Sequence, residues 1–297
     1  MARMTLHADL LSWFDSRARD LPWRAGTTPW GVLVCEVMGQ QTPMSRVVPR
    51  WHEWMARWPE PAALAAAPQA DVLRAWDRMG YPRRALNLQR CAAEICEYFG
   101  GGVPGDEATL RSLPGVGAYT AAAVAAFAFT RRTAVLDTNV RRVLARLSGS
   151  AAPSSSSVTA AERGRATALL PEDPGVSAHW NEALMELGAL VCVPRPRCEE
   201  CPVAAHCAWL AAGRPAGVLP PRRGQAWAGT DRQSRGRVLA HLRAADTAWV
   251  GRGVLIEAAR VSDDAAQPAR ALASLVSDGL VSEHDCEYAL GGDILQR

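Results

Sequence analysis

The glutamate at position 36 is the first residue whose surroundings indicate chemistry. It is the only charged residue between Arg24 and Arg46, and it lies in the apolar stretch "WGVLVCEVM". A glutamate on a helix usually faces solvent, but the apolar neighbours of Glu36 argue against solvent on most sides. Burial raises the pKa of a carboxylic acid, so Glu36 can be protonated near neutral pH, as a general acid must be.

Asp137, in "TAVLDTNVRRVLARL", is a second carboxylate, and two interpretations of it are open. An aspartate followed by apolar residues at helical spacing is typical of an N-cap, which stabilises a helix by roughly 1 kcal/mol. A catalytic role requires a second carboxylate that faces the same cavity, and Glu36 is the candidate. Paired carboxylates suit reactions at an anomeric carbon, where one donates a proton and the other stabilises oxocarbenium charge.

Four of the eight cysteines form a compact cluster, "CVPRPRCEECPVAAHC". They are Cys192, Cys198, Cys201 and Cys207, with gaps of five, two and five residues. The N-terminal stretch does not resemble a signal peptide, so a metal or iron–sulfur site is favoured over disulfides. Structural zinc usually takes two separated C-x-x-C pairs, and only one is present here. A four-iron cluster held by one loop fits better, with zinc as the alternative.

The segment "SLPGVGAYTAAAVAAFAF" joins a tight turn to an alanine-rich run. Gly115 and Gly117 permit backbone conformations that are closed to other residues, and they would leave free N–H groups at the start of a helix. Such groups bind phosphate, so two helices joined by this turn can hold a nucleic-acid backbone without regard to its sequence. A plain helix–helix turn is the alternative.

The elements that must position these residues are predominantly helical. Apolar residues recur at three- and four-residue intervals up to about residue 212, which predicts an all-α part. A Ser-rich loop occupies 148–160, and a linker rich in Gly, Pro and Arg occupies 213–230. Two helical segments and a short β-like ending predict a small winged-helix-like module at 231–297. No run of apolar residues is long enough to span a membrane, and we expect a cytoplasmic, nucleoid-associated protein.

The positive charge of the chain is carried entirely by arginine. All 33 basic residues are Arg, and the net charge is +3, so overall charge does not itself indicate a nucleic-acid partner. Arginine stays protonated and cannot act as an amine nucleophile. We therefore expect that no side chain of this protein forms a Schiff base.

Together these segments resemble the adenine DNA glycosylases (A/G-specific, MutY-type) of the helix-hairpin-helix endonuclease III superfamily. The matching pieces occur in family order over about residues 8–212. They are the cysteine loop and "LPWR" (21–24), "EVMGQQTPMSRVVPRW" (36–51), "LRAWDRMGYPRRALNL" (73–88), "LPGVGAYTAAAV" (113–124), "VLDTNVRRVLAR" (135–146) and "NEALMELGALVC" (181–192).

The resemblance implies a two-domain helix-hairpin-helix DNA glycosylase fold. Residues 1–24 and 136–212 would form a helical domain that ends in a [4Fe–4S] cluster loop, and residues 25–135 a six-helix barrel that carries the hairpin. The implied partner is double-stranded DNA with a mispaired adenine, bound by a monomer. The target base must leave the duplex before an acid can reach it.

The resemblance also implies roles for individual residues. Glu36 resembles the acid that protonates adenine, and Asp137 the carboxylate that stabilises or traps the sugar cation, with Asn139 beside it. Tyr119 stands where bifunctional relatives have a Schiff-base lysine, so we expect a monofunctional enzyme. The remaining implied contacts are Trp23, Arg24 and Glu182 with the flipped adenine, Gln41 with the base stack as a wedge, and Leu113, Gly115, Val116 and Gly117 with the DNA backbone.

The sequence departs from the family pattern in several places. The first cysteine gap is one residue shorter than usual, Gly39 replaces a leucine, and Pro82 replaces an aromatic residue near the opposite base. The tail after Ala212 is short for the Nudix-like domain with which longer members recognise 8-oxoguanine, so the opposite-base preference stays open.

Two rival functions also stay open. One is a sister glycosylase that removes a mismatched or damaged pyrimidine, and Glu36 and Glu182 argue for adenine instead. The other is a non-enzymatic DNA-binding iron–sulfur protein. The pairing of Glu36 with Asp137 argues against it, because phosphate binding needs neither carboxylate.

Overall fold

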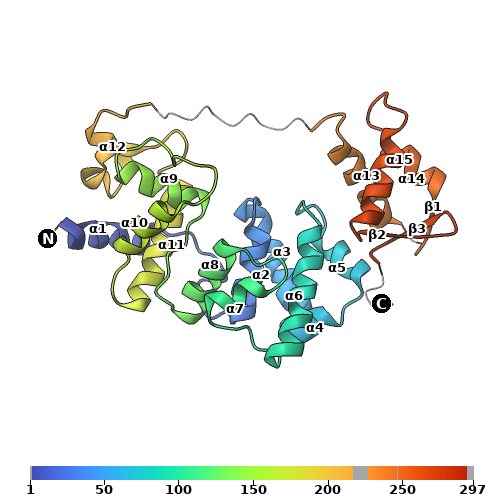
Figure 1. The fold of residues 1–297 in the computed structure, drawn as a ribbon, viewed down its shortest axis with the longest axis horizontal. Coiled ribbons are helices and arrows are strands. Elements are labelled where there is room, and N and C mark those ends of the chain that lie inside the picture. Colours follow the sequence, from blue (N-terminus) through green and yellow to red (C-terminus); the bar gives the residue numbers. More distant parts are fainter. Residues whose placement is uncertain (1, 217–226, 246, 293–297) are drawn as a thin grey trace. The chain divides into compact units, whose positions relative to one another are not determined.

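The computed structural model describes residues 2–216, 227–245 and 247–292 (Figure 1). Helices dominate the described chain up to Ala211, which confirms the predicted helical character of this part. Its α-helices are α1 (Ala2–Arg17), α2 (Pro29–Gly39), α3 (Met44–Arg57), α4 (Pro61–Ala65), α5 (Gln69–Trp76), α6 (Arg83–Phe99), α7 (Glu107–Ser112), α8 (Ala118–Phe129), α9 (Thr138–Leu147), α10 (Ala160–Leu169), α11 (Pro174–Leu190) and α12 (Ala208–Ala211). Part of the predicted linker, residues 217–226, lies outside the described residues.

The described chain forms two compact units, which we treat separately. The first unit consists of Met1–Glu36, Pro104–Ser112 and Val116–Arg222, and the second of Val37–Val103, Leu113–Gly115 and Arg223–Arg297. The domain boundaries expected from the sequence stay predictions. None of the helices among the described residues combines the length and apolar character that a membrane span needs.

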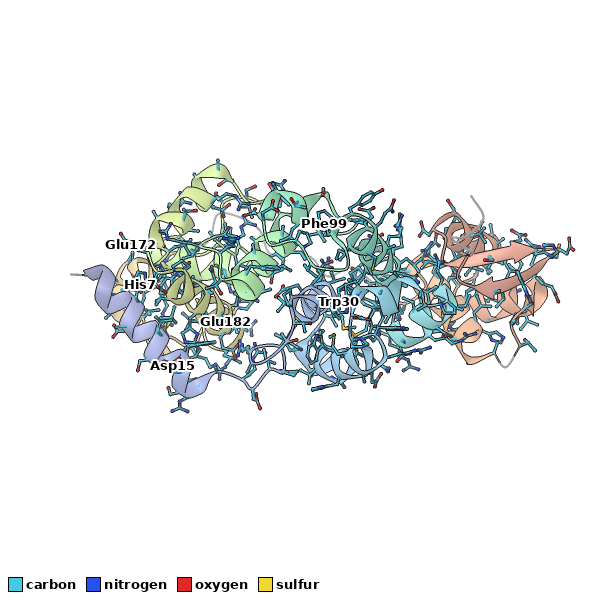
Figure 2. All side chains as sticks on the ribbon, turned by 90° about the horizontal axis from the view of Figure 1, so that it is seen from below. His7, Asp15, Trp30, Phe99, Glu172 and Glu182 are labelled. Atoms are coloured by element: carbon cyan, nitrogen blue, oxygen red, sulfur yellow. The ribbon has the colours of Figure 1, made fainter. Side chains whose placement is uncertain are left out.

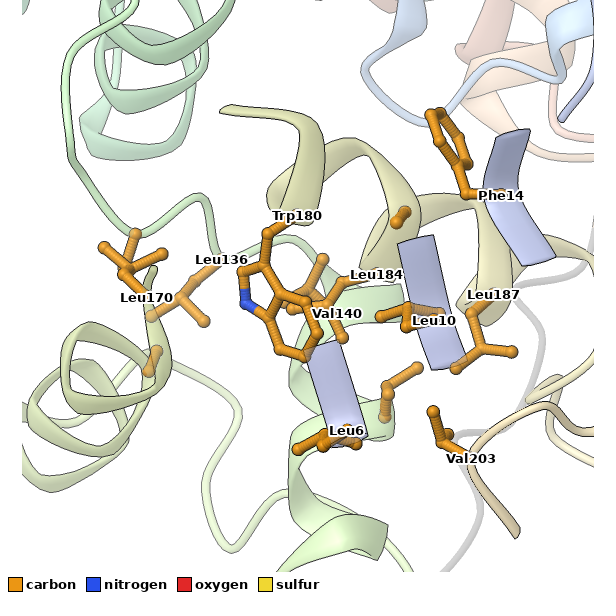
Figure 3. Packing of buried hydrophobic residues seen from close by; sticks show 14 of the residues in the cluster. Leu6, Leu10, Phe14, Leu136, Val140, Leu170, Trp180, Leu184, Leu187 and Val203 are labelled. Carbon is orange, nitrogen blue, oxygen red and sulfur yellow. The ribbon is translucent and has the colours of Figure 1, made fainter. Parts of the chain in front are cut away.

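The core of the first unit forms where α1, α9 and α11 pack together. Apolar residues at helical spacing on α1, such as Leu6 and Leu10, meet the apolar face of α11, on which Trp180 and Leu184 are buried (Figure 3). Burying each such side chain contributes on the order of 1.5–3 kcal/mol, so this packing fixes the register of α11 against its neighbours. A smaller cluster of Ala122, Ala123, Ala126 and Val135 packs along α8.

The core of the second unit is built around tryptophan rings of α3 and α5. The rings of Trp54 and Trp76 meet edge to face, with centroids 5.4 Å apart, and both side chains are fully buried. The indole of Trp54 donates a hydrogen bond to the carbonyl oxygen of Ala75, so its polar group is satisfied in the core. Helix α6 packs against both α5 and α4.

Residues 231–290 form a small module of helices and strands in the second unit. Its elements are α13 (Asp231–Ala244), β1 (Val250–Gly251), α14 (Arg252–Ala259), α15 (Gln267–Ser277), β2 (Val281–His284) and β3 (Glu287–Leu290). The strands form an antiparallel sheet in the order β1-β3-β2. The sequence predicted the ending at β2 and β3 but not β1 or α14. This order of elements supports the winged-helix-like assignment, which stays a prediction.

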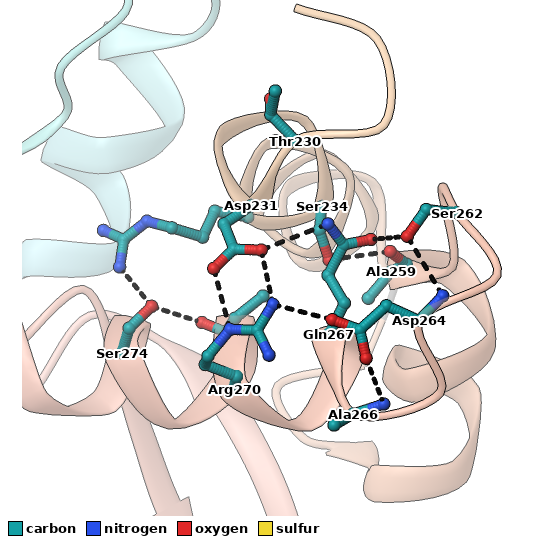
Figure 4. A network of polar contacts seen from close by, with 12 residues as sticks. Thr230, Asp231, Ser234, Ala259, Ser262, Asp264, Ala266, Gln267, Arg270 and Ser274 are labelled. Atoms are coloured by element: carbon teal, nitrogen blue, oxygen red, sulfur yellow. Dashed lines mark hydrogen bonds and ion pairs between the residues drawn. The ribbon is translucent and has the colours of Figure 1, made fainter.

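Polar contacts tie the helices of the module together (Figure 4). Asp231 at the start of α13 forms an ion pair with Arg270 of α15 at 2.9 Å, and Gln267 also donates a hydrogen bond to Asp231. The hydroxyl of Ser234, which is fully buried, donates to the carbonyl oxygen of Ala259 at 2.7 Å. These contacts link α13 to both α14 and α15.

Candidate active site

Helix α2 carries Glu36 in its last turns, in a largely apolar environment. Neighbouring residues on the helix, including Leu33 and Cys35, are buried. Burial raises the pKa of Glu36 to about 7, and the charges of Asp137 and Glu182 raise it as well, whereas a hydrogen bond with Tyr119 lowers it. A carboxyl group with this pKa can be protonated near neutral pH, which is the property that the sequence analysis expects of Glu36.

Tyr119 lies in the first turn of α8 and forms a hydrogen bond with Glu36. Burial raises the pKa of its phenol well above the usual value, and the negative charges of Glu36 and Asp137 act in the same direction. Tyr119 therefore stays a neutral hydroxyl at physiological pH. It can share a proton with the carboxyl group of Glu36 but cannot form a covalent imine.

Asp137 is a helix cap, as one interpretation of the sequence had it, and its catalytic role stays a prediction. It is the N-cap of α9, because its Oδ1 accepts a hydrogen bond from the backbone N–H of Val140 at 2.6 Å. Its Oδ2 accepts a hydrogen bond from the side-chain amide of Asn139 at 2.9 Å. Burial raises the pKa of Asp137, whereas these hydrogen bonds stabilise its charged form. The cap therefore orients a carboxylate whose charge also acts on Glu36.

Glu182 adds a third carboxyl group from α11, where Asp15 of α1 lies nearby (Figure 2). Its side chain is 24% exposed, and the Nδ1 atom of His179 lies 3.5 Å from its Oε2 atom. The other nitrogen of His179 lies 2.7 Å from Asp15. Burial raises the pKa of Glu182, and the charge of Arg24 opposes that shift. Arg24 therefore contributes positive charge beside Glu182.

Arg24 is held by Glu186, which the sequence analysis did not identify. Glu186 is 0% exposed, and its Oε2 atom accepts a hydrogen bond from Arg24 at 2.8 Å. Its Oε1 atom accepts hydrogen bonds from the backbone and the side chain of Arg19. Burial raises the pKa of Glu186, but these hydrogen bonds outweigh it and the pKa falls to about 2. Glu186 is the only acid in the apolar run "ALMELGAL", which is the same signal that identified Glu36.

Arg142 is a second residue that the sequence analysis did not single out. Its Nη2 atom donates to Asn139 Oδ1 at 2.8 Å, and its Nε atom donates to the carbonyl oxygen of Cys192 at 2.6 Å. The helices α9 and α11 approach closely at this point because Gly188 lacks a side chain. A Cβ atom there would lie 2.7 Å from the Cβ atom of Asn139. The role of Arg142 depends on how α9 packs against α11, and no local sequence pattern predicts that packing.

The remaining predicted site residues differ in exposure. Trp23 is partly buried in the segment between α1 and α2, whereas Gln41 is exposed and has a positive φ of 53°. In the turn before α8, Gly115 has a φ of 77°, as a left-handed turn position requires, and both Gly115 and Gly117 are exposed. Leu113 and Val116 are buried, so their predicted contacts with DNA stay untested.

All four cysteines of the cluster line one pocket, together with Arg146 and Trp209. No three His, Cys, Asp or Glu side chains among the described residues are grouped so that they could hold a single metal ion. Four thiols around one shared pocket are a donor set that suits a structural metal or an iron–sulfur cluster. Buried Arg146 places its Nη1 atom 3.3 Å from Cys192 Sγ and donates to the carbonyl oxygen of Val193, which orders the loop.

This chain is similar to known base excision repair proteins. Residues 34–165 match the model of the HhH-GPD superfamily base excision DNA repair proteins. The chain is 47% identical to the adenine DNA glycosylase of Mycobacterium tuberculosis, over 96% of this chain and 93% of that protein. It is 50% identical to the adenine DNA glycosylase of Mycolicibacterium smegmatis, over 96% of both chains.

Among solved structures, a thermostable thymine-DNA glycosylase is similar to this chain. The two superpose with a TM-score of 0.65 at 27% sequence identity, over 71% of this chain and 97% of that chain. This likeness supports the predicted helix-hairpin-helix glycosylase fold.

Proposed function

Because this chain belongs to the adenine DNA glycosylase family, we propose that it is a monofunctional glycosylase that excises adenine mispaired with 8-oxoguanine or guanine in double-stranded DNA. The observation that carries the proposal is the grouping of Glu36, Asp137 and Tyr119, with the pKa of Glu36 raised to about 7. An acid of this pKa can donate a proton at neutral pH and still recover it between turnovers.

The reaction begins when the adenine nucleotide leaves the base stack and enters the site. The carboxyl group of Glu36 donates its proton to a ring nitrogen of adenine, which turns the base into a neutral leaving group. The bond between the sugar and the base then breaks, and the electron pair leaves with adenine. The carboxylate of Asp137 stabilises the positive charge that develops on the sugar. Water adds to the anomeric carbon, with the Glu36 carboxylate as the base that accepts its proton.

The residues around this centre support recognition of adenine. Arg24 and Glu182 together offer donors and an acceptor to the edge of a purine, and the Glu186 ion pair holds Arg24 in place. Trp23 offers an aromatic face nearby in the sequence. Backbone N–H groups at Gly115 and Gly117 are the candidates for contacts with DNA phosphate.

We further propose that Cys192, Cys198, Cys201 and Cys207 hold a [4Fe–4S] cluster. When bound, the cluster would cross-link the loop and supply a redox-active centre. The loop also carries Arg195 and Arg197, both of which are exposed and suited to bidentate contacts with phosphate. The chain's own Arg146 already orders the backbone of this loop.

Base release from duplexes with adenine opposite 8-oxoguanine, guanine, cytosine or thymine tests the proposal. We expect cleavage after hot alkali for the first two duplexes. Glu36→Gln should retain DNA binding and lose about a hundredfold or more of the excision rate. Near-wild-type excision by that variant would remove Glu36 from the mechanism.

Absence of lyase activity is tested separately. A lyase needs an amine that forms an imine with the sugar, and this chain has no lysine. Borohydride added during turnover should therefore trap no more protein–DNA adduct than a background from stray amines. Stoichiometric trapping that follows base release would overturn the monofunctional assignment.

A pyrimidine glycosylase is the second candidate, because a thymine-DNA glycosylase shares the fold. Duplexes with thymine or uracil opposite guanine, added to the same panel, distinguish it. Release of thymine without release of adenine would replace the first proposal by the second.

A further inference from the structure

Arg84, in the first turn of α6, joins two turns of the second unit through one guanidinium group. Its Nη1 atom contacts the end of α2 and the turn that follows. Its Nη2 atom contacts Thr42 in that same turn and also the turn before α6. Nη1 donates to the carbonyl oxygens of Val37 at 2.9 Å, Met38 at 3.2 Å and Gln40 at 2.5 Å. Nη2 donates to the hydroxyl of Thr42 and to the carbonyl oxygens of Met79 and Gly80, each at 3.1 Å.

Each of these turns presents a non-glycine residue in the left-handed conformation. Gln41 has a φ of 53° and is exposed, and Tyr81 has a φ of 46° and is 47% exposed. Residues other than glycine seldom adopt this conformation unless their surroundings impose it. Because Arg84 is bonded to Gln40 and Thr42 on both sides of Gln41, and to Gly80 directly before Tyr81, its guanidinium imposes both turns together.

The charge of Arg84 is held by dipoles and aromatic rings. Within the described part of the chain, its hydrogen-bond acceptors are carbonyl and hydroxyl oxygens, and no carboxylate forms an ion pair with it. The guanidinium lies 5.1 Å from the ring centroid of Trp76 and 5.7 Å from that of Tyr81. Most of the hydrogen bonds of this guanidinium therefore go to the backbone of two turns that carry exposed residues.

The C-terminal module contacts the turn that carries Tyr81. The guanidinium of Arg232, from α13, lies 5.1 Å from the ring centroid of Tyr81. Asp278 accepts from Arg83, the residue before Arg84, and from Arg235 of α13. Gly292 donates its backbone N–H to Gln69 of α5, and Arg243 donates to the carbonyl oxygen of Leu73. The module is therefore attached to the elements that flank the Tyr81 turn.

We propose that Arg84 is a positioning residue for base extrusion, which fixes the Gln41 and Tyr81 turns as one rigid element, and that Arg232 of the C-terminal module braces the Tyr81 turn. This inference rests on the proposed function and on the expectation from the sequence that Gln41 enters the base stack as a wedge. A residue that enters a duplex must hold its place against the stacking that it disturbs. The guanidinium of Arg84 holds both turns rigid. The C-terminal module then supports base extrusion by bracing the Tyr81 turn, without itself contacting a base.

The test compares Arg84→Met with Arg74→Met, a control that removes an exposed guanidinium from α5. Single-turnover adenine release is measured on a mismatched duplex and on a duplex in which adenine is bulged and already unstacked. We expect Arg84→Met to release adenine at least tenfold more slowly from the mismatch and within threefold of wild type from the bulge. Fluorescence of 2-aminopurine at the target position, which rises on unstacking, should fail to rise with this variant.

Equal losses on both substrates, or no loss on either, would overturn the inference. If Arg84→Met does not fold, Arg232→Ala decides, because Arg232 is exposed. It should show a smaller loss on the mismatch that disappears on the bulge, and an unchanged rate on the mismatch would reject the brace. Wild-type protein that releases adenine from neither substrate would instead reject the proposed function, so the two failures are distinguishable.

Discussion

Asn139 connects Asp137 to the cysteine loop through a single side-chain amide. Its nitrogen donates to Asp137 Oδ2 at 2.9 Å, and its oxygen accepts from Arg142 Nη2 at 2.8 Å. Arg142 in turn donates to the carbonyl oxygen of Cys192. A continuous path of hydrogen bonds therefore runs from the carboxylate of the candidate active site to the first cysteine of the loop.

Replacing Arg142 by methionine should slow base release by about tenfold or more, because Asn139 then loses the donor that fixes its orientation toward Asp137. Single-turnover excision and DNA affinity are measured side by side, and affinity should change little. Arg141→Met is the matched control, since Arg141 bonds to Glu162 instead. An equal slowing in both variants would assign the effect to general destabilisation.

The rate of base release should depend on pH through Glu36. Its pKa is about 7, and the protonated form is the active acid, so the rate should fall as pH rises through about 7. Because the charge of Glu182 raises the pKa of Glu36, Glu182→Gln should move this decline to lower pH. Single-turnover rates across the neutral range check both statements. A rate that is flat or rises through pH 7 would contradict the assignment of Glu36 as the acid.

Replacing Glu186 by glutamine should lower the free energy of unfolding by about 1–3 kcal/mol, because Arg19 and Arg24, which are both partly exposed, lose their buried charged partner. The pKa of Glu186 is lowered in the folded protein to about 2, so its ionised form stabilises the fold above the unfolded pKa. The difference between wild type and variant should therefore shrink as pH falls toward about 2.

Urea denaturation followed by circular dichroism measures this effect. Glu172→Gln, at an exposed position of the same unit, is the control and should change stability by less than about 0.5 kcal/mol. A Glu186→Gln variant as stable as this control would show that the ion pairs are dispensable for the fold.

Cys198→Ser should abolish the brown colour and broad absorbance expected of a [4Fe–4S] protein, and it should weaken DNA binding or solubility. One missing thiolate leaves an iron site open and frees the loop that carries Arg195 and Arg197. Cys286→Ser, at an exposed cysteine of the C-terminal module, is the control. A soluble, colourless Cys198→Ser protein with normal DNA affinity would show that the loop needs no cluster.

Local patterns were sufficient to find the residues whose environment is set by their own helix. A few neighbouring residues are enough to recognise the isolation of Glu36 and the capping position of Asp137. Arg142 depends on how α9 meets α11, and Arg84 on how two turns meet one helix, so no single segment identifies them. The strand β1 was missed because it has only two residues, which is too short for an alternating pattern.

The close approach of Gly188 to Asn139 has a genetic consequence. A Cβ atom at position 188 would lie 2.7 Å from that of Asn139, so replacing Gly188 displaces the amide that orients Asp137. Adenine left opposite 8-oxoguanine converts a G·C pair into a T·A pair, and in a glycine codon this change yields valine, cysteine, tryptophan or a stop. The kind of mutation that this protein is proposed to prevent could thus inactivate its own gene at this codon. A lineage that suffered it would acquire a mutator phenotype with every acidic group of the site still encoded.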